Sequence, residues 1–458
     1  MKRDALPNLF KEYLQEVVGA AKTEIVLSAI ESSTPPVSIR LNPYKPVPFG
    51  LLSVVSEAKE RDDRIPWCSD GYYLEERPAF TLDPAFHAGA YYVQEPSSMI
   101  LELLRPILSS GSQSTSLTNG SHSPSLSKEG HPPVKRVLDL CAAPGGKSTH
   151  LISMLSPDDH VVVNEVVKNR VGILKENILK WGNHNVKIIS REARDVAAGC
   201  LQMGEQFDFI LVDAPCSGEG MFRKDPNAIL EWSEQNVKMC AARQKQILLD
   251  IWPALAPGGL LAYSTCTFNL YENDLNIEWF KQNSGAESVM IEDLHPGNLN
   301  LTSQIDEWGV VRAECGGYRL LPGLLRGEGL FFCLLKKPGS QSGGQKFGTE
   351  FGGQKFGTEP GGQKLGSQSG SKSDFDPRIS PEGALSLALG DQFPKVEVSR
   401  EVALRYLKRD AVQLVDAPLG FVVITYGGLP LGFAKNVGTR ANNLYPKSWR
   451  IRKDLSDL

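Results

Sequence analysis

The stretch "VLDLCAAPGGKSTHL", residues 137–151, decides the fold of this chain. Its apolar start is typical of a buried strand, and its end has the spacing of a helix. Between them, Gly145 and Gly146 allow the backbone to approach a ligand closely, beside the first N–H groups of the helix. The stretch predicts a ligand-binding loop, with a plain tight strand-to-helix turn as the alternative.

Around this stretch, apolar runs alternate with helical segments. Helical spacing covers residues 166–180 and 236–254, and strand-like runs cover 136–140, 160–165, 186–190, 207–213, 258–264 and 329–337. Strands that are apolar along nearly their whole length are typical of a mostly parallel sheet covered by helices on both faces. The sequence therefore predicts an α/β fold whose ligands bind at the carboxyl ends of the strands.

Two low-complexity stretches divide the 458 residues of the chain. Residues 109–131 are rich in Ser and Gly, and residues 339–373 repeat "GGQK" from positions 343, 352 and 361. Neither stretch has the apolar content of a core, so we interpret both as flexible linkers. Three blocks remain, at 1–108, 132–338 and 374–458.

The composition indicates an ordinary globular protein, with 41% hydrophobic and 22% charged residues. Eight cysteines occur without a C-x-x-C pair, which argues against a disulfide framework or a zinc site and fits a reducing cytoplasm. The first residues lack the uninterrupted apolar segment of a leader, and no run approaches the ~20 apolar residues of a membrane span. We therefore expect a cytoplasmic protein with no metal and no membrane contact.

Glu165 ends the strand-like run "HVVVNE" about twenty residues after the glycine turn, where an acid can accept hydrogen bonds from ribose hydroxyls. A nicotinamide cofactor would require G-x-G-x-x-G, which is absent. The run "GGKST" resembles the end of a phosphate-binding loop, but Cys141 occupies the position of that motif's first glycine. The remaining candidate is an adenosyl cofactor without phosphates, S-adenosylmethionine.

The next strand ends carry further polar groups. Asp195 lies in "REARDV", where a solvated or capping acid is the alternative, and Asp213 ends the apolar run "FDFILVD". Cys216 follows Asp213 closely, and Cys266 ends the run "LLAYSTCTFN" at 260–269. A single cysteine in such a position is usually a buried, unreactive thiol. Two thiols and an acid at adjacent strand ends, however, predict a reactive site.

Such a group of residues suits chemistry on a pyrimidine. Carbon 5 of the ring is a poor nucleophile, and a thiolate that adds to carbon 6 makes it reactive, so that one difficult step becomes two easier ones. After methyl transfer, the proton on carbon 5 and the thiol must both leave, which requires an acid–base group nearby. An acid such as Asp213 can hold the ring nitrogen and the exocyclic amine of cytosine.

Three long motifs make the resemblance to a known family explicit. The stretches "DLCAAPGGKS" at 139–148, "DAPCSGEGMFRKDP" at 213–226 and "YSTCTFNLYEND" at 263–274 resemble the signatures of the Sun-type RNA cytosine-5 methyltransferases. The bacterial RsmF/YebU-like ribosomal RNA methyltransferases are the most similar group. "SIRLNPYK" and "QEPSSMI" before the middle block, and "LGFAKNVGTRANNLYPKSWRIR" after it, resemble the flanking domains of that group.

The resemblance implies roles for particular residues. Cys266 would be the nucleophile, Cys216 would assist product release, and Asp213 would take part in catalysis. DNA cytosine methyltransferases use the cysteine of the "PC" pair as nucleophile, so the assignment between the two thiols is open. The implied binding site for S-adenosylmethionine comprises Cys141, Ala142, Ala143, Pro144, Gly145, Gly146, Lys147, Glu165, Arg170, Asp195 and Asp213.

The resemblance also implies an architecture: a Rossmann-like methyltransferase core between an N-terminal α+β RNA-binding domain and a C-terminal PUA-like β-rich domain. Arg40 and Asn42 would belong to the RNA-binding unit, or alternatively to an ordinary surface strand. Tyr445 and Trp449 would stack on bases, or alternatively fill a small core. Residues 395–453 contain eleven Lys or Arg against four Asp or Glu, although the chain as a whole carries −4. The cations expected to meet RNA include Lys435, Arg440, Lys447 and Arg450.

The implied function is methylation of carbon 5 of a cytosine in ribosomal RNA of the small subunit, by a monomer that uses S-adenosylmethionine. Three alternatives remain open. These are a transfer RNA cytosine-5 methyltransferase, an RNA-binding ribosome-assembly factor with an inactive methyltransferase fold, and, more distantly, a phosphate-loop NTPase.

Overall fold

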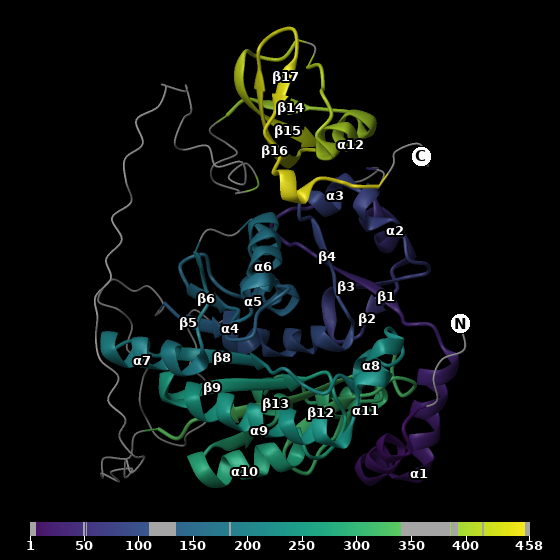
Figure 1. Ribbon diagram of the computed structural model, residues 1–458, viewed down its shortest axis with the longest axis vertical. Helices are drawn as coiled ribbons and strands as arrows, with labels where there is room; N and C mark the ends of the chain where they lie inside the picture. Colours follow the sequence, from purple (N-terminus) through teal and green to yellow (C-terminus); the bar gives the residue numbers. More distant parts are fainter. Residues whose placement is uncertain are drawn as a thin grey trace.

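The described part of the chain is organised around three β-sheets (Figure 1). The structure is a computed structural model that describes residues 6–48, 51, 53–109, 134–182, 185–339, 385, 393–414 and 416–453. Nearly all of the two expected linkers, 109–131 and 339–373, lies outside the described residues. No helix in the described part of the chain is long and apolar enough to cross a membrane.

The central sheet has the order β7-β6-β5-β8-β9-β13-β12-β11, and β10 pairs with β13. Neighbouring strands from β7 to β9 are parallel, whereas β13 runs antiparallel to β9. The strands are β5 (Arg136–Asp139), β6 (His160–Asn164), β7 (Val186–Ile189), β8 (Phe207–Asp213), β9 (Leu255–Thr265), β10 (Glu287–Val289), β11 (Val311–Arg312), β12 (Gly317–Leu320) and β13 (Leu330–Lys336). The α/β fold is confirmed, whereas the expectation of a mostly parallel sheet holds only from β7 to β9, because the pairings of β10 to β13 are antiparallel.

Helices cover both faces of this sheet (Figure 1). Val137 packs into one core with Leu151 and Leu174, whereas its neighbour Leu138 packs into a second core with Leu248 on the other face. This double burial explains why the strands are apolar throughout. The helices of the first face are α5 (Gly146–Met154) and α6 (Lys168–Trp181), and those of the second are α7 (Ala193–Met203), α9 (Glu234–Ile251) and α10 (Asp274–Ser284).

Shorter elements complete the middle of the chain. They are η3 (Glu219–Met221), α8 (Pro226–Glu231), η4 (Trp252–Ala254), η5 (Ile291–Leu294) and α11 (Leu301–Glu307). The first of these, η3, follows the "PC" pair directly and lies in the loop that carries Cys216.

The N-terminal part forms an antiparallel sheet in the order β2-β3-β1-β4. Before it, α1 (Asn8–Ser32) packs Phe10 and Tyr13 against Trp232 of the middle block. The remaining elements are β1 (Val37–Leu41), α2 (Val54–Arg61), β2 (Arg64–Ile65), β3 (Cys68–Leu74), η1 (Phe80–Leu82), α3 (Pro84–His87), β4 (Tyr91–Val93), η2 (Ser97–Leu104) and α4 (Arg105–Ser109).

The C-terminal part is a second small sheet, in the order β14-β15-β16-β17, with one helix against it. Its elements are β14 (Lys395–Glu397), α12 (Arg400–Lys408), β15 (Gly420–Tyr426), β16 (Leu429–Asn436), β17 (Ala441–Asn443) and η8 (Lys447–Trp449). Residues such as Tyr406 and Tyr445 share one apolar cluster with Ile39 and Ala85 of the N-terminal part. Figure 1 shows this sheet next to α3, far from the lower helices α9 and α10.

Candidate active site

The two thiols meet at the carboxyl edge of the parallel strands. Cys216 follows β8 and Cys266 follows β9, and the register pairs Asp213 with Ser264 where these strands end. The Sγ atoms of Cys216 and Cys266 lie 3.1 Å apart, and both side chains are half-buried. The expectation that strand ends bring the two cysteines together is confirmed as geometry.

Asp213 lies at the centre of a small polar network beside the thiols. Its Oδ2 accepts a hydrogen bond of 2.8 Å from Nζ of Lys147, and its Oδ1 accepts one of 2.7 Å from Oγ of Ser264. Burial opposes the charged form of Lys147, but the Asp213 carboxylate outweighs it and raises the pKa of the ammonium group. Lys147 therefore stays charged next to Asp213.

The thiols are coupled to each other and to this network. The hydrogen bond with Cys266, followed by burial, raises the pKa of the Cys216 thiol well above its usual range. Cys266 also interacts electrostatically with Lys147 and contributes to the raised pKa of the ammonium group. Cys216 therefore remains a thiol next to the sulfur of Cys266.

The conformation of Gly145 and two side-chain hydrogen bonds fix the loop between β5 and α5. Gly145 has φ 112°, a conformation that suits glycine, and it occupies the N-cap position of α5. Arg170 donates a hydrogen bond of 2.6 Å to the carbonyl of Ala143, and Asn177 donates one of 2.8 Å to that of Pro144. These contacts leave the first N–H groups of α5 facing the loop.

Glu165 and Asp139 supply acids to the same region. Glu165 follows β6 and is buried; its Oε1 accepts a hydrogen bond from the N–H of Val167, and its Oε2 lies 3.5 Å from Arg170. Burial raises the pKa of Asp139 to about 7. Ser148 donates to one oxygen of Asp139, whereas the other buried oxygen has no partner among the described residues.

The remaining predicted cofactor residues differ in exposure. Cys141 is half-buried at the end of β5, and burial raises the pKa of its thiol. Asp195 is exposed in the first turn of α7, after β7. Asp195 thus lies at the expected edge of the sheet, but no contact ties its side chain to the loop among the residues described.

The alternative that Arg40 and Asn42 lie on an ordinary surface strand is wrong, because both side chains are buried; their membership of an RNA-binding unit stays a prediction. Arg40 is 1% exposed, stacks on Trp181 and donates a hydrogen bond of 2.7 Å to Thr149. Asn42 is 2% exposed and donates to the carbonyl of Trp181. A buried cation or amide requires hydrogen-bond partners, and these two side chains find them both in the N-terminal part, at Gln94 and Gly89, and in the central part of the chain. Both side chains therefore connect the segment around β1 to α5 and α6.

Tyr445 and Trp449 belong to the core rather than to an RNA-stacking surface. Tyr445 is 0% exposed, and Trp449 packs against it with ring centroids 6.1 Å apart. The predicted cations divide into two groups: Lys435 is half-buried over the ring of Phe421, and the exposed ones are Arg440, Lys447 and Arg450.

Sequence reasoning missed several residues of the site. Ser264, Ser217, Glu219 and Glu272 all hydrogen-bond to the thiol-bearing loops or to Asp213. The polar residues at the ends of the sequence motifs could have predicted them. A charged residue in a short loop after an apolar strand is costly unless it has a partner, so several such residues together indicate a hydrogen-bonded network.

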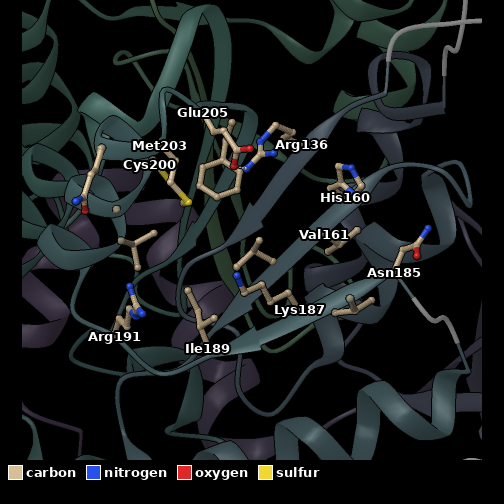
Figure 2. Close-up of a pocket in the computed structure, with 16 residues that line it drawn as sticks. Arg136, His160, Val161, Asn185, Lys187, Ile189, Arg191, Cys200, Met203 and Glu205 are labelled. Carbon is tan, nitrogen blue, oxygen red and sulfur yellow. Dashed lines mark hydrogen bonds and ion pairs between the residues drawn. The ribbon is translucent and has the colours of Figure 1, made fainter. Parts of the chain in front are cut away.

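A separate cavity of about 630 Å³ lies along β6 and β7 beside α7 (Figure 2). Its lining runs from Arg136 and His160, at the starts of their strands, to Cys200 and Met203 of α7. Neither thiol lines it, nor does Asp213 or Lys147. This cavity therefore takes no part in the candidate active site.

A buried cluster of Cys68, Glu102 and His150 has the ligand types of a metal site, with ligand atoms within 4.8 Å of one another. The Glu102 carboxylate, however, is already held by His150 at 2.9 Å and by Arg105. Burial lowers the pKa of His150 to about 4. We assign this cluster to the packing of η2 against α5 rather than to a metal.

Three family models match consecutive parts of the chain. A model of the 16S rRNA methyltransferase RsmB/F matches residues 131–336. The N-terminal domain of 16S rRNA methyltransferase RsmF matches residues 6–96, and the RsmF PUA domain matches residues 393–451.

Curated relatives and solved structures agree with these matches. Ribosomal RNA small subunit methyltransferase F of Cronobacter sakazakii is 31% identical over 344 residues, which is 73% of this chain and 64% of that protein. The protein of the same name from Serratia proteamaculans is 33% identical over 308 residues, or 66% of this chain and 56% of that protein. The chain thus spans less than two thirds of either relative.

A methyltransferase homologue from Pyrococcus horikoshii has a similar fold, with a TM-score of 0.53, 24% identity and coverage of 72% of this chain and 95% of that one. The N-terminal, catalytic and PUA models of one family follow each other along this sequence, around a Rossmann-like sheet with two thiols at its carboxyl edge. The chain belongs to the RsmB/F methyltransferase family and has the domain composition of RsmF.

Proposed function

We propose that this protein transfers a methyl group from S-adenosylmethionine to carbon 5 of a cytosine in small-subunit ribosomal RNA. The observation that carries the proposal is the contact of 3.1 Å between the Sγ atoms of Cys216 and Cys266, beside the ion pair of Lys147 and Asp213. An acid–base pair next to a thiolate and a second thiol is the set of groups that covalent attack on a pyrimidine requires.

The loop at residues 141–147 and Glu165 fit an adenosyl cofactor. The buried Glu165 carboxylate suits ribose hydroxyls, and the N-terminus of α5 suits the methionine end. The oxygen of Asp139 that has no partner among the described residues offers one further acceptor. When bound, S-adenosylmethionine supplies an electrophilic methyl sulfonium. Arg170 stiffens the loop through the Ala143 carbonyl and lies against Glu165.

Each residue of the site has a separate role in the reaction of the pyrimidine. The Cys266 thiolate forms a bond to carbon 6, and the electron pair of the ring double bond moves to carbon 5, which accepts the methyl group. Asp213 holds the amine edge of the ring, and Lys147 balances its charge. The proton on carbon 5 then leaves to a base, the carbon–sulfur bond breaks, the double bond re-forms, and Cys216 assists this release.

We infer that the protein acts as a monomer, because both thiols, the acid and the cofactor loop come from residues 139–274 of one chain. We also infer that it is cytoplasmic. The names of the relatives favour small-subunit ribosomal RNA over transfer RNA. The rival function, an RNA-binding assembly factor with an inactive fold, is disfavoured because such a factor has no chemical need for the paired thiols and the half-buried ion pair.

Substitution of each cysteine tests the proposal. We expect Cys266→Ala to abolish methylation and to form no protein–RNA adduct, since no thiolate is left to attack carbon 6. We expect Cys216→Ala to attack and methylate but to resolve slowly, so that a denaturant-resistant complex with RNA accumulates. The complex is detected as a shifted gel band that RNase removes, and bisulfite mapping of total RNA identifies the modified cytosine.

Retained binding of S-adenosylmethionine in both variants serves as the control for folding. An adduct in the Cys266 variant and none in the Cys216 variant would reverse the two roles. Methylation that persists in Cys266→Ala and in Cys216→Ala alike would exclude covalent catalysis by this pair.

A further inference from the structure

The two loops that carry the thiols exchange buried carboxylates. Glu219 lies three residues after Cys216, and its Oε2 accepts hydrogen bonds from the backbone N–H of Phe268 (2.6 Å) and of Asn269 (3.1 Å), just after Cys266. Its Oε1 accepts from the side chains of Asn269 (2.9 Å) and Trp232 (3.1 Å). The loop after β8 is thus fastened to the loop after β9.

Glu272 makes the reciprocal connection. It follows Cys266 in the chain, and its Oε2 accepts from the backbone N–H of Ser217 (3.0 Å), the residue next to Cys216. Gln244 donates both to this oxygen (2.8 Å) and to the carbonyl of Pro215 (3.0 Å). Each thiol loop therefore inserts a carboxylate into the other.

Both carboxylates are deeply buried, Glu219 at 1% and Glu272 at 0% exposure. A buried carboxylate is costly unless donors surround it, and the described residues supply donors to both of these carboxylates. A hydrogen bond of 2.8 Å from the N–H of Gly220 to the carbonyl of Cys266 and a contact of 2.9 Å between the hydroxyls of Ser217 and Thr267 add to the connection.

We propose that Glu219 and Glu272, here called the carboxylate clasp, are positioning residues that hold the two thiols at contact distance. Neither residue touches the substrate. The consequence for catalysis, that Cys216 stays within reach of the adduct on Cys266, rests on the proposed function, whereas the positioning of the sulfur atoms does not.

The first test measures the distance between the thiols without RNA. Diamide oxidises the pair to a disulfide: each sulfur loses its hydrogen, one S–S bond forms, and diamide takes up both hydrogens as the hydrazine. We expect Glu219→Gln and Glu272→Gln to slow this disulfide about tenfold or more, because the new amide N–H group faces donors and the loops separate. Mass spectrometry of peptides quantifies the Cys216–Cys266 bond.

Asp83→Asn is the matched control. Asp83 is also a buried carboxylate, and it accepts hydrogen bonds from Val54, Ala85 and Tyr91 in the N-terminal part. We expect it to leave the rate of disulfide formation unchanged. Thr267→Ala removes the contact with Ser217 and a hydrogen bond from Asn269 but keeps both carboxylates, and it serves as the mild variant if the glutamine variants lose binding of S-adenosylmethionine. Wild-type rates in folded clasp variants, or no disulfide in the wild type, would overturn the proposal.

The second test uses RNA. In single-turnover reactions, we expect the clasp variants to accumulate the denaturant-resistant adduct as Cys216→Ala does, with KM little changed and kcat reduced. If the wild type neither methylates RNA nor forms an adduct, the proposed function fails, and the diamide experiment still decides the clasp. Slow disulfide formation with wild-type kcat and no adduct would limit the clasp to a structural role.

Discussion

Glu165 combines burial with a single weak ion pair. Its exposed fraction is 3%, and the nearest cation, Arg170, lies 3.5 Å away and is itself half-exposed. Such a carboxylate can still accept hydrogen bonds from ribose hydroxyls, because only its Oε1 is taken, by the N–H of Val167. Its position at the end of β6, beside the loop that follows β5, makes it the residue on which cofactor affinity should depend most.

We expect Glu165→Ala to weaken binding of S-adenosylmethionine by about 1.5–3 kcal/mol, the usual worth of hydrogen bonds to a charged group. Isothermal titration calorimetry measures the change. Glu231→Ala, which removes an exposed acid of α8, is the control and should bind as the wild type does. Unchanged affinity in Glu165→Ala would remove this residue from the cofactor site.

At the scale of elements, the strand ends were predictable and the contacts between distant elements were not. An apolar run that stops at a polar residue marks the end of a strand, so Asp213, Cys216 and Cys266 could be placed on one edge from the pattern alone. The contacts of Arg40 could not be predicted, because its partners Thr149 and Trp181 lie more than a hundred residues away in the sequence. Burial of a cation leaves no periodic signature in the sequence.

The contact of α3 with the C-terminal part contains a buried imidazole. Nε2 of His87 lies 2.9 Å from the carbonyl of Thr81, and Nδ1 lies 3.3 Å from the hydroxyl of Tyr445. Burial, followed by the nearby charge of Lys180, lowers the pKa of His87 to about 3. In the folded protein the ring is therefore neutral at pH 5, whereas in the unfolded chain it binds a proton below about pH 6.5.

From this difference we expect acid to weaken the packing of α3 on the C-terminal part. As pH falls from 7 to 5, the unfolded state gains a proton that the folded state does not, and His87 lowers the free energy of unfolding by about 2 kcal/mol. His87→Gln keeps a donor for Thr81 without titrating, so its unfolding midpoint in urea should fall less over the same range. Identical pH dependence in both proteins would contradict this assignment.

At the scale of the whole molecule, the two flanking parts are joined to each other. Leu404 and Tyr445 of the C-terminal part lie in the same apolar cluster as Ile39, Val55 and Tyr91 of the N-terminal part. Removing residues 374–458 would expose this cluster, so a truncation would disturb the N-terminal sheet as well. The proposed role of the C-terminal part in RNA binding is better tested with its exposed side chains than by deletion.

Arg440, Lys447 and Arg450 are exposed and lie in the segment that matches the PUA domain model. If they contact phosphates, their joint replacement by Gln should weaken RNA binding and reduce the slope of log K against log salt by about 0.7–0.9 for each lost contact. Binding of S-adenosylmethionine should not change, because its predicted site lies in residues 139–213. Fluorescence anisotropy between low and physiological salt measures both affinity and slope.

A second triple variant separates local contacts from net charge. Lys22, Lys187 and Lys238 are exposed on α1, β7 and α9, and their replacement by Gln changes the charge of the protein by the same amount. Since Debye screening confines each charge to about 10 Å at 0.1 M salt, these distant lysines should alter the slope little. Equal slopes in the two triple variants would mean that the C-terminal cations act only through overall charge, and the RNA-binding surface would then have to lie on another part of the molecule.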